Sequence, residues 1–445
     1  MDEATLFPLP EARQASVPQP SRPEDARVLR PVRQQISWMP RDLEEAVAPD
    51  HVARAIWAFL ERLNLDAFYA SIKAVVDRPG RPTTDPRVLL AVWLLGTVEG
   101  VGSARRLARL CEEHDAYRWL CGGVPINYHM LADFRVAHQG ALDDLLTQII
   151  GSLMAAGAVT LEKVAQDGMR VRASAGAASF RRKDALKACL KAAREQVERL
   201  AQEREQPDPG RDPRKERARE RAAAERERRV QEALGYLPQA QAAKDRQQES
   251  LAMRKRERLT EARTSTTDPE ARVMKMPDGG FRPAYNVEFA TAVGSGVILG
   301  VGVTSEGGDA RQALPMEQQL LRRTGQHPKA YLVDGGFATR ETITGLEARG
   351  VAVYAPVRLP RNRPEAERYQ AKYADTPAVA AWRSRMATEE GKSSYRERGR
   401  TAEWTNAQTR QHGVGQFTVR GLANVLSVTL LIAVAHNLLR WAAPG

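Results

Sequence analysis

The sequence predicts an all-helical N-terminal region followed by a mixed α/β region that a charged helical block interrupts. Three observations predict this order. Apolar residues recur at helical spacing from Asp50 to about Ala156. Short β-rich runs alternate with helix-like segments between residues 284 and 356. Residues 181–262 consist largely of charged, strong helix formers.

Length and composition narrow the class of protein. A chain of 445 residues is long enough for two or three domains with a large buried core. Its formal charge of +12 predicts attraction to polyanions, either nucleic acid or an anionic membrane surface. The three cysteines have no CxxC spacing, which argues against a disulfide framework or a structural zinc site. Because the polar start of the chain lacks the apolar stretch of an export signal, we expect a cytoplasmic protein.

We expect five segments along the chain. The first is a Pro-rich, charged arm that buries too little apolar surface to offset its ordering entropy, so it should be flexible. A helical region follows, and the α/β region after it is split in two by the charged block. The segments are 1–35 (arm), 36–157 (helical region), 158–180 (first α/β part), 181–262 (charged block) and 263–445 (second α/β part).

A helix-turn-helix pattern lies inside the helical region. The glycines of Gly100–Ser103 can turn the chain after a helix that ends near Glu99, and the Ser103 hydroxyl can cap the next helix. In this second helix Leu107 and Leu110 should be buried. The arginines on its more exposed side either contact DNA or form a solvated basic face. They are Arg105, Arg106 and Arg109.

The charged block predicts two or three long helices, with breaks at Pro207–Gly210 and Gly235–Pro238. Glutamates and arginines alternate closely along it, so solvated pairs within each helix are the simplest explanation. A basic arm lying on DNA is the functional alternative.

The α/β region predicts a mixed sheet. Two glycines at Gly294–Gly296 join two strands into a hairpin. The expected segments are a strand within 159–171, the hairpin strands 285–293 and 297–304, a helix at 311–324, a strand at 330–333, a helix at 339–349 and a strand at 351–356.

Two aspartates in this region are candidates for metal chemistry. The sequence has no phosphate-binding glycine loop, HExxH or GxSxG motif, so nucleotide hydrolysis, zinc proteolysis and esterase chemistry lose their usual signals. Asp167 lies on the first expected strand and Asp334 follows a later one. Adjacent parallel strands would bring both carboxylates together to bind Mg²⁺ or Mn²⁺ for phosphodiester chemistry. An Asx turn and an Asp-Gly turn are the structural alternatives.

The third acid should come from the C-terminal helical part, and Glu403 is the preferred residue. It precedes Arg410 by seven residues, so both point the same way from a helix and Arg410 can hold a DNA phosphate. Trp404 is expected to anchor that helix to the core. Its rivals fit less well. Glu389 and Glu390 fall in a polar stretch expected to be a loop, and Glu397 precedes Gly399, which should interrupt the helix.

The apolar segment Leu422–Leu439 contains no charged residue and is just long enough to span a bilayer. Polar residues interrupt it and no second span accompanies it. A helix buried in a globular core explains it better than a membrane anchor.

At its C-terminal end the chain resembles the DDE-type transposases of bacterial insertion sequences, in the branch with a helical transposase domain before the catalytic one. Tyr395, Arg398, Glu403 and Arg410 match the family signature, with Arg410 where Lys is commoner. Glu288 stands where a Gln is common. Further family landmarks are Arg81–Pro86, Tyr117–Gly123, Ala284–Val287 and His436–Leu438.

This resemblance implies a ribonuclease H-like catalytic domain in which Asp167, Asp334 and Glu403 hold Mg²⁺, with Mn²⁺ as a substitute. It implies cleavage and strand transfer of double-stranded DNA at the ends of an insertion sequence, by a homo-oligomer and without a membrane. Tyr395, Arg398 and Arg410 are then expected to contact DNA. A ribonuclease H-like nuclease and a catalytically inactive DNA-binding descendant are the alternatives.

Overall fold

The computed structural model describes residues 42–73, 82–205, 212–249, 261–359, 364, 367–413 and 415–442. The arm expected over 1–35 and the break expected at Pro207–Gly210 lie outside these residues. The chain divides into two units, Met1–Asp42 and Leu43–Gly445, and the fold described below is that of the second unit.

The first part of this unit is helical, as predicted. Its α3 is apolar all round and almost entirely buried, as expected for a central core helix. The Ser103 hydroxyl caps α4 by accepting a hydrogen bond from the Arg106 backbone N–H, and Leu107 is buried while Leu110 is only half-buried. The helices are α1 (Val52–Glu61), α2 (Asp66–Tyr69), α3 (Pro86–Val98), α4 (Ala104–Glu113), α5 (Asp115–Cys121), α6 (Tyr128–Ala137) and α7 (Gln139–Ala155).

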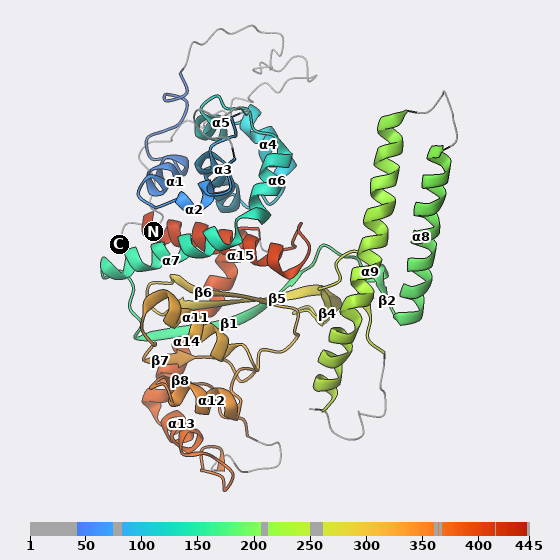
Figure 1. Cartoon of the computed structure of the whole chain (residues 1–445). Coiled ribbons are helices and arrows are strands. Elements are labelled where there is room, and N and C mark those ends of the chain that lie inside the picture. The colour runs from blue at the N-terminus through green and yellow to red at the C-terminus, as the bar shows by residue number, and fades with distance from the viewer. Residues whose placement is uncertain are drawn as a thin grey trace, which may run out of the picture. The chain divides into compact units, whose positions relative to one another are not determined.

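A mixed sheet follows, again as predicted (Figure 1). Its path is β4-β5-β1-β7-β8, and β6 also pairs with β5. The strands β5 and β1 are antiparallel, whereas β7 runs parallel to β1 and β8 parallel to β7. The sheet strands are β1 (Lys163–Arg172), β4 (Arg272–Lys275), β5 (Phe281–Ala292), β6 (Ile298–Thr304), β7 (Ala330–Leu332) and β8 (Ala352–Tyr354).

Five further helices accompany the sheet. The helix α14 packs against β1 and β5, and α11 packs against β6. They are α11 (Ala313–Thr324), α12 (Arg340–Glu347), α13 (Pro377–Ala387), α14 (Glu389–Gln411) and α15 (Leu422–Ala442).

The course of α14 corrects two expectations. Glu389 and Glu390 form its first turn rather than a loop, because the Thr388 side chain caps the helix by accepting from the Gly391 N–H. Gly399 does not interrupt the helix. A glycine costs a helix interior only about 1 kcal/mol, and burial of one face of α14 against the sheet offsets that cost.

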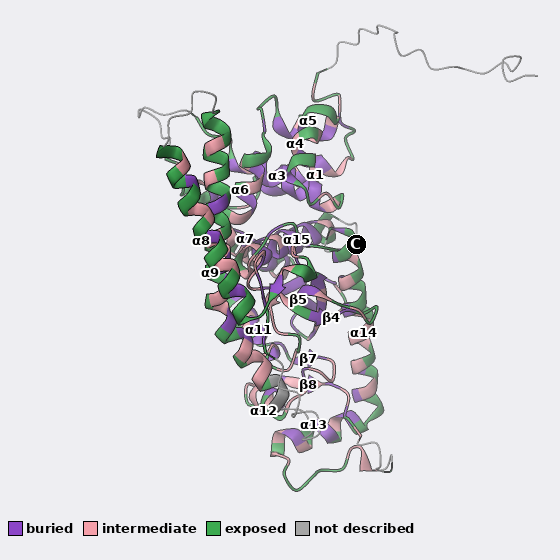
Figure 2. Cartoon of the chain, turned by 90° about the vertical axis from the view of Figure 1, so that its right-hand side faces the viewer, coloured by how far each residue is buried: buried purple, intermediate pink, exposed green. Residues whose placement is uncertain are grey.

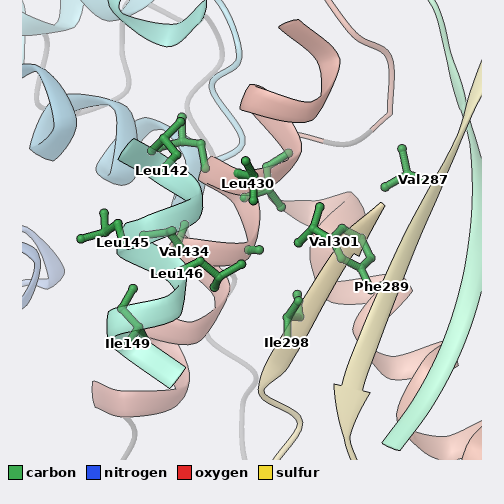
Figure 3. Close-up of a cluster of buried hydrophobic side chains, with 14 of the residues drawn as sticks. Leu142, Leu145, Leu146, Ile149, Val287, Phe289, Ile298, Val301, Leu430 and Val434 are labelled. Atoms are coloured by element: carbon green, nitrogen blue, oxygen red, sulfur yellow. The ribbon is translucent and has the colours of Figure 1, made fainter. Parts of the chain in front are cut away.

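The apolar C-terminal helix α15 lies in the core, as expected. By length and composition alone it would pass for a membrane span. In the fold, however, it packs between α7 and the hairpin strand β6, with Leu430 and Val434 among the buried side chains (Figure 3). Its polar residues find partners there, because the Asn437 amide pairs with the backbone N–H and C=O of Ile298.

The charged block contains α8 (Lys183–Glu205) and α9 (Pro213–Glu249), which pack side by side (Figure 1). Most of their surface is exposed (Figure 2). The short strands β2 (Phe180–Arg181) and β3 (Thr264–Ser265), together with the turn η2 (Ala177–Ser179), connect this pair to the sheet.

The break expected at Gly235–Pro238 is wrong, because α9 continues through it. Ala233 and Leu237 are buried in a small cluster with Leu186 of α8. The Thr264 hydroxyl also donates to the Ala233 carbonyl at 2.8 Å. These tertiary contacts outweigh the helix-breaking tendency of Pro238.

Candidate active site

The sheet register aligns the two predicted aspartates. Val164 of β1 lies opposite Tyr331 of β7, and Ala165 lies opposite Leu332. Continued by two residues, the same register sets Asp167 level with Asp334, just beyond the end of β7. Burial raises the pKa of the Asp167 carboxyl, and nearby Asp334 raises this pKa further, while Arg398 opposes both effects.

Two side chains of α14 hold the Asp167 carboxylate. Arg398 Nη2 donates to its Oδ1 at 2.7 Å, and Asn406 Nδ2 donates to its Oδ2 at 3.0 Å. The two donors are eight residues apart, just over two helical turns, so they project from one side of α14. Arg398 was expected to contact DNA, and here it forms a largely buried ion pair with Asp167.

Asp334 shapes the loop after β7. Its Oδ1 accepts from the backbone N–H groups of Gly336 at 2.6 Å and Phe337 at 3.3 Å. This is the Asp-Gly turn that the sequence offered as a structural alternative. The turn also fixes the position of the carboxylate at the C-terminal end of a parallel strand, where open α/β sheets collect ligands.

The acids of α14 occupy different environments. Glu403 is exposed and lies three residues before Asn406, which contacts Asp167. Glu397 instead pairs with Lys163 of β1 at 2.7 Å. Across the described part of the chain, no three Asp, Glu, His or Cys side chains are arranged to hold a metal ion. The structure therefore brings Asp167 and Asp334 together and leaves Glu403 at the surface of α14.

Trp404 was expected to anchor α14 to the core; the residue remains 38% exposed, and its ring packs against α15 and the hairpin turn. Its ring contacts His436 of α15 edge-on, with 5.4 Å between ring centroids. The guanidinium of Arg440 lies 5.1 Å from the Trp404 ring centre. Gly296 of the hairpin turn lies directly beneath the same ring.

A buried polar network behind the aspartates escaped the sequence analysis. Gln166 Nε2 and Asn286 Nδ2 donate to the two carboxylate oxygens of Glu288, and the Tyr331 hydroxyl donates to Gln166. Burial, followed by the charge of Asp309, raises the pKa of Glu288 to about 8. The landmark Ala284–Val287 contains Asn286 of this network, and it was, with the unusual Glu288, the available signal for it.

Asp309 and Asn406 were also missed. Asp309 lies in the loop between β6 and α11 and accepts a hydrogen bond from Asn286 at 2.6 Å. Burial raises the pKa of its carboxyl, and Asp334 adds to this effect. Neither residue follows a strand-end pattern, so the sequence carried no signal for either.

The surroundings of the aspartates suit a hard divalent cation. Carboxylate oxygens are the ligands that Mg²⁺ and Mn²⁺ prefer. A Cβ atom added at Gly336 would lie only 2.9 Å from Oδ1 of Asp334, so this glycine leaves open a space beside the carboxylate that a side chain would fill.

The residues expected to bind DNA form two groups. Arg105, Arg106 and Arg109 are exposed on α4, and the Arg105 guanidinium lies 5.0 Å from the ring centre of Tyr128. Tyr395, Arg398 and Arg410 lie on α14, where Arg410 is exposed and Tyr395 is half-buried.

The C-terminal end of α14 contacts the turn that precedes α4. A Cβ at Gly100, where φ is +72°, would lie 2.8 Å from the Gln411 carbonyl oxygen. The His412 ring lies 3.4 Å from the Val98 carbonyl oxygen. The helix that holds Asp167 therefore also supports the helix-turn-helix turn.

Comparison with known families gives two matches. Residues 41–137, which include α1 to α6, match the family model described as a transposase domain (DUF772). Residues 361–442 match the model described as a transposase DDE domain. This second match includes the α14 residues Arg398, Glu403 and Asn406. No curated protein and no solved structure matches the chain.

Proposed function

The chain belongs to the DDE-type transposases of insertion sequences, and from this premise we propose that it binds the ends of its own element and catalyses metal-dependent DNA cleavage and strand transfer. One observation carries the proposal. Asp167 of β1 lies near Asp334, which follows the adjacent parallel strand β7 by two residues, and α14, from the part matched to a transposase DDE domain, holds Asp167 through Arg398 and Asn406.

We assign the catalytic region to a ribonuclease H-like fold. The strand that carries Asp167 has an antiparallel neighbour on one side, continued by a hairpin partner, and two parallel strands on the other. This arrangement supports the assignment. The proposed division assigns 36–157 to DNA binding, 158–180 and 263–445 to catalysis, and 181–262 to a helical insertion.

Asp167, Asp334 and Glu403 are the proposed ligands of Mg²⁺, for which Mn²⁺ substitutes. Bound ions would activate water or a 3′-hydroxyl and stabilise the leaving oxygen of the phosphodiester. The protein's part is to orient the carboxylates. Arg398 and Asn406 use one hydrogen bond on each oxygen of Asp167, and a carboxylate has lone pairs left for further ligands.

DNA binding is assigned to the exposed arginines. Those of α4 project from the second helix of a helix-turn-helix, the helix that enters the major groove in this class of motif. Arg410 and Tyr395 would contact DNA near the aspartates. Because transposition joins two element ends, a homo-oligomer assembled on DNA is part of the proposal.

The test substitutes the two competing glutamates of α14 separately. Glu403→Gln should lose Mg²⁺-dependent cleavage of element-end DNA by orders of magnitude while binding persists, because an amide does not supply the ligand charge. Glu397→Gln is the matched control. It removes only a half-exposed ion pair with Lys163, worth less than about 1 kcal/mol. A dead Glu397→Gln beside an active Glu403→Gln would overturn the assignment.

The products separate the proposed function from its alternatives. A transposase yields element DNA joined to target DNA, whereas a nuclease yields only cut ends. Full binding by the wild-type protein without any cleavage, in Mg²⁺ and in Mn²⁺, would identify an inactive DNA-binding descendant.

A further inference from the structure

We propose that Asp309 is a further ligand of the divalent cation, paired with Asp334. This inference rests on the proposed metal-dependent function and adds a carboxylate from a different element, the loop between β6 and α11. It rests on how the two oxygens of Asp309 are placed.

One oxygen of Asp309 is fixed by the sheet. Asn286 Nδ2, from β5, donates to Oδ1 at 2.6 Å and also reaches Glu288 at 3.2 Å. Since an Asn amide is uncharged, this contact orients the carboxylate without neutralising it. Oδ2 takes no part in this contact.

The other oxygen of Asp309, Oδ2, lies near Asp334 beside Gly336. A Cβ built on Gly336 would lie 3.4 Å from Oδ2 of Asp309 and 2.9 Å from Oδ1 of Asp334. Both carboxylate oxygens therefore lie beside the same side of Gly336, next to one another. Neighbouring carboxylate oxygens from two elements are the ligands that a shared divalent cation would need.

Gly168 admits Asp309 from the other side. It directly follows Asp167, and its own Cβ would lie 3.0 Å from Oδ1 of Asp309. A larger residue at position 168 would displace the Asp309 carboxylate. Asp309 thus lies beside Gly168, which follows Asp167, and beside the turn formed by Asp334. A single carboxylate from this loop therefore lies near both proposed metal ligands.

Repulsion between the neighbouring carboxylates favours a bound cation at this site. Carboxylates held close together in a partly buried site repel one another, and a bound divalent cation removes that cost. Asp167 has Arg398 as a cationic partner. Asp309 accepts its hydrogen bond from the uncharged Asn286, and the charges of Arg170 and Arg398 offset only part of the effect of burial and of Asp334 on the pKa of its carboxyl.

The experiment measures Mn²⁺ binding to the full chain by isothermal titration, without DNA. Asp309→Asn keeps an acceptor for Asn286 and removes the charge. It should weaken Mn²⁺ binding roughly tenfold or more, as should the reference variant Asp334→Asn. The control Glu306→Gln removes a carboxylate from the same loop, where it pairs with Arg246 at the surface, and should bind Mn²⁺ like the wild type.

Thermal unfolding supplies a second readout, because Asp309→Asn should change the melting temperature differently without and with Mn²⁺. Without metal, Asp309→Asn should melt at the same temperature as the wild type or higher, because one repelling charge is gone. With Mn²⁺ it should gain less stability than the wild type. A lower melting temperature without metal, or failure to fold, would assign Asp309 a structural role and overturn the inference.

The outcomes also separate this inference from the proposed function. If Asp334→Asn loses Mn²⁺ binding and Asp309→Asn retains it, only the role of Asp309 is wrong. If the wild type itself binds no Mn²⁺, or if Asp167→Asn and Asp334→Asn both bind Mn²⁺ like the wild type, then the proposed metal site is wrong as a whole, together with the role of Asp309.

Discussion

Glu288 is a buried carboxyl whose charge is strongly opposed by its surroundings. Its side chain is buried beside Gln166 and Asn286, and its pKa is raised to about 8 by burial and by Asp309. In the unfolded chain a glutamate titrates near 4.5. Between these two values the folded state holds more protons than the unfolded state, so stability falls as the pH rises.

We therefore predict that Glu288→Gln flattens the pH dependence of stability. In the wild type the slope attributable to Glu288 approaches about 1.4 kcal/mol per pH unit within this window. The variant has no titrating group at this position and should gain stability relative to the wild type as the pH increases from 5 to 8. Melting temperatures of both proteins at pH 5, 6.5 and 8 test this. Parallel curves would show that Glu288 is ionised throughout.

Single residues also show how far sequence reasoning extends. Asp167 and Asp334 were predictable because each belongs to an apolar run that marks a central strand, and the parallel register then aligns them. Asp309 and Asn406 were not, since their relevance depends on contacts with residues more than 20 positions away. No local pattern encodes such a contact.

Among the elements, α14 differs most from expectation. Local propensity predicted a loop at its start and an interruption at Gly399, and the structure has one continuous helix. Propensity differences of about 1 kcal/mol are small beside the tertiary contacts of α14, which packs its small side chains against β1 and β5 and holds Asp167 through Arg398 and Asn406. The same reason explains the unbroken α9. The strands and the hairpin were predicted better, because runs of apolar residues mark buried strands and glycines mark the turn between them.

The docking of α14 through Trp404 leads to a prediction at the hairpin turn. Gly296 has φ +70°, and a Cβ there would lie 2.8 Å from Trp404 Cζ3. Gly296→Ala should destabilise the protein by about 2 kcal/mol or more, through backbone strain plus displacement of the Trp404 ring. Chemical denaturation measures this loss.

Gly294→Ala is the matched control for this variant. Gly294 has φ +92° in the same turn, yet a Cβ there meets nothing within 4 Å. Its substitution adds backbone strain without the clash. The excess loss in Gly296→Ala therefore isolates the contact with Trp404, and equal losses would mean that this contact does not hold α14.

For the molecule as a whole, the regions proposed for catalysis and for DNA binding share structural elements. The helix α15, from the C-terminal end, packs against α7 and α3 of the helical region as well as against β6. Arg135 of α6 donates to the Gly102 carbonyl in the turn before α4 and to Thr418, just before α15. The proposed DNA-reading helix and the proposed active site are thus built onto one core, which favours binding and cleavage of the same DNA end.

The net charge of +12 predicts strongly salt-dependent binding of duplex DNA, because each phosphate contact releases condensed counterions. Affinity measured from low to physiological salt should fall steeply, and a flat response would contradict DNA binding.

Replacing the three α4 arginines, Arg105, Arg106 and Arg109, with alanine should reduce the preference for element-end DNA over unrelated DNA. The matched control replaces three exposed arginines of α9, Arg217, Arg219 and Arg221, and so removes the same charge. We expect the control to weaken binding to both DNAs equally and to keep the preference, since phosphate contacts alone carry no sequence information. If both triple variants lose affinity in parallel and the preference survives in each, α4 is a general basic face and another element reads the DNA ends.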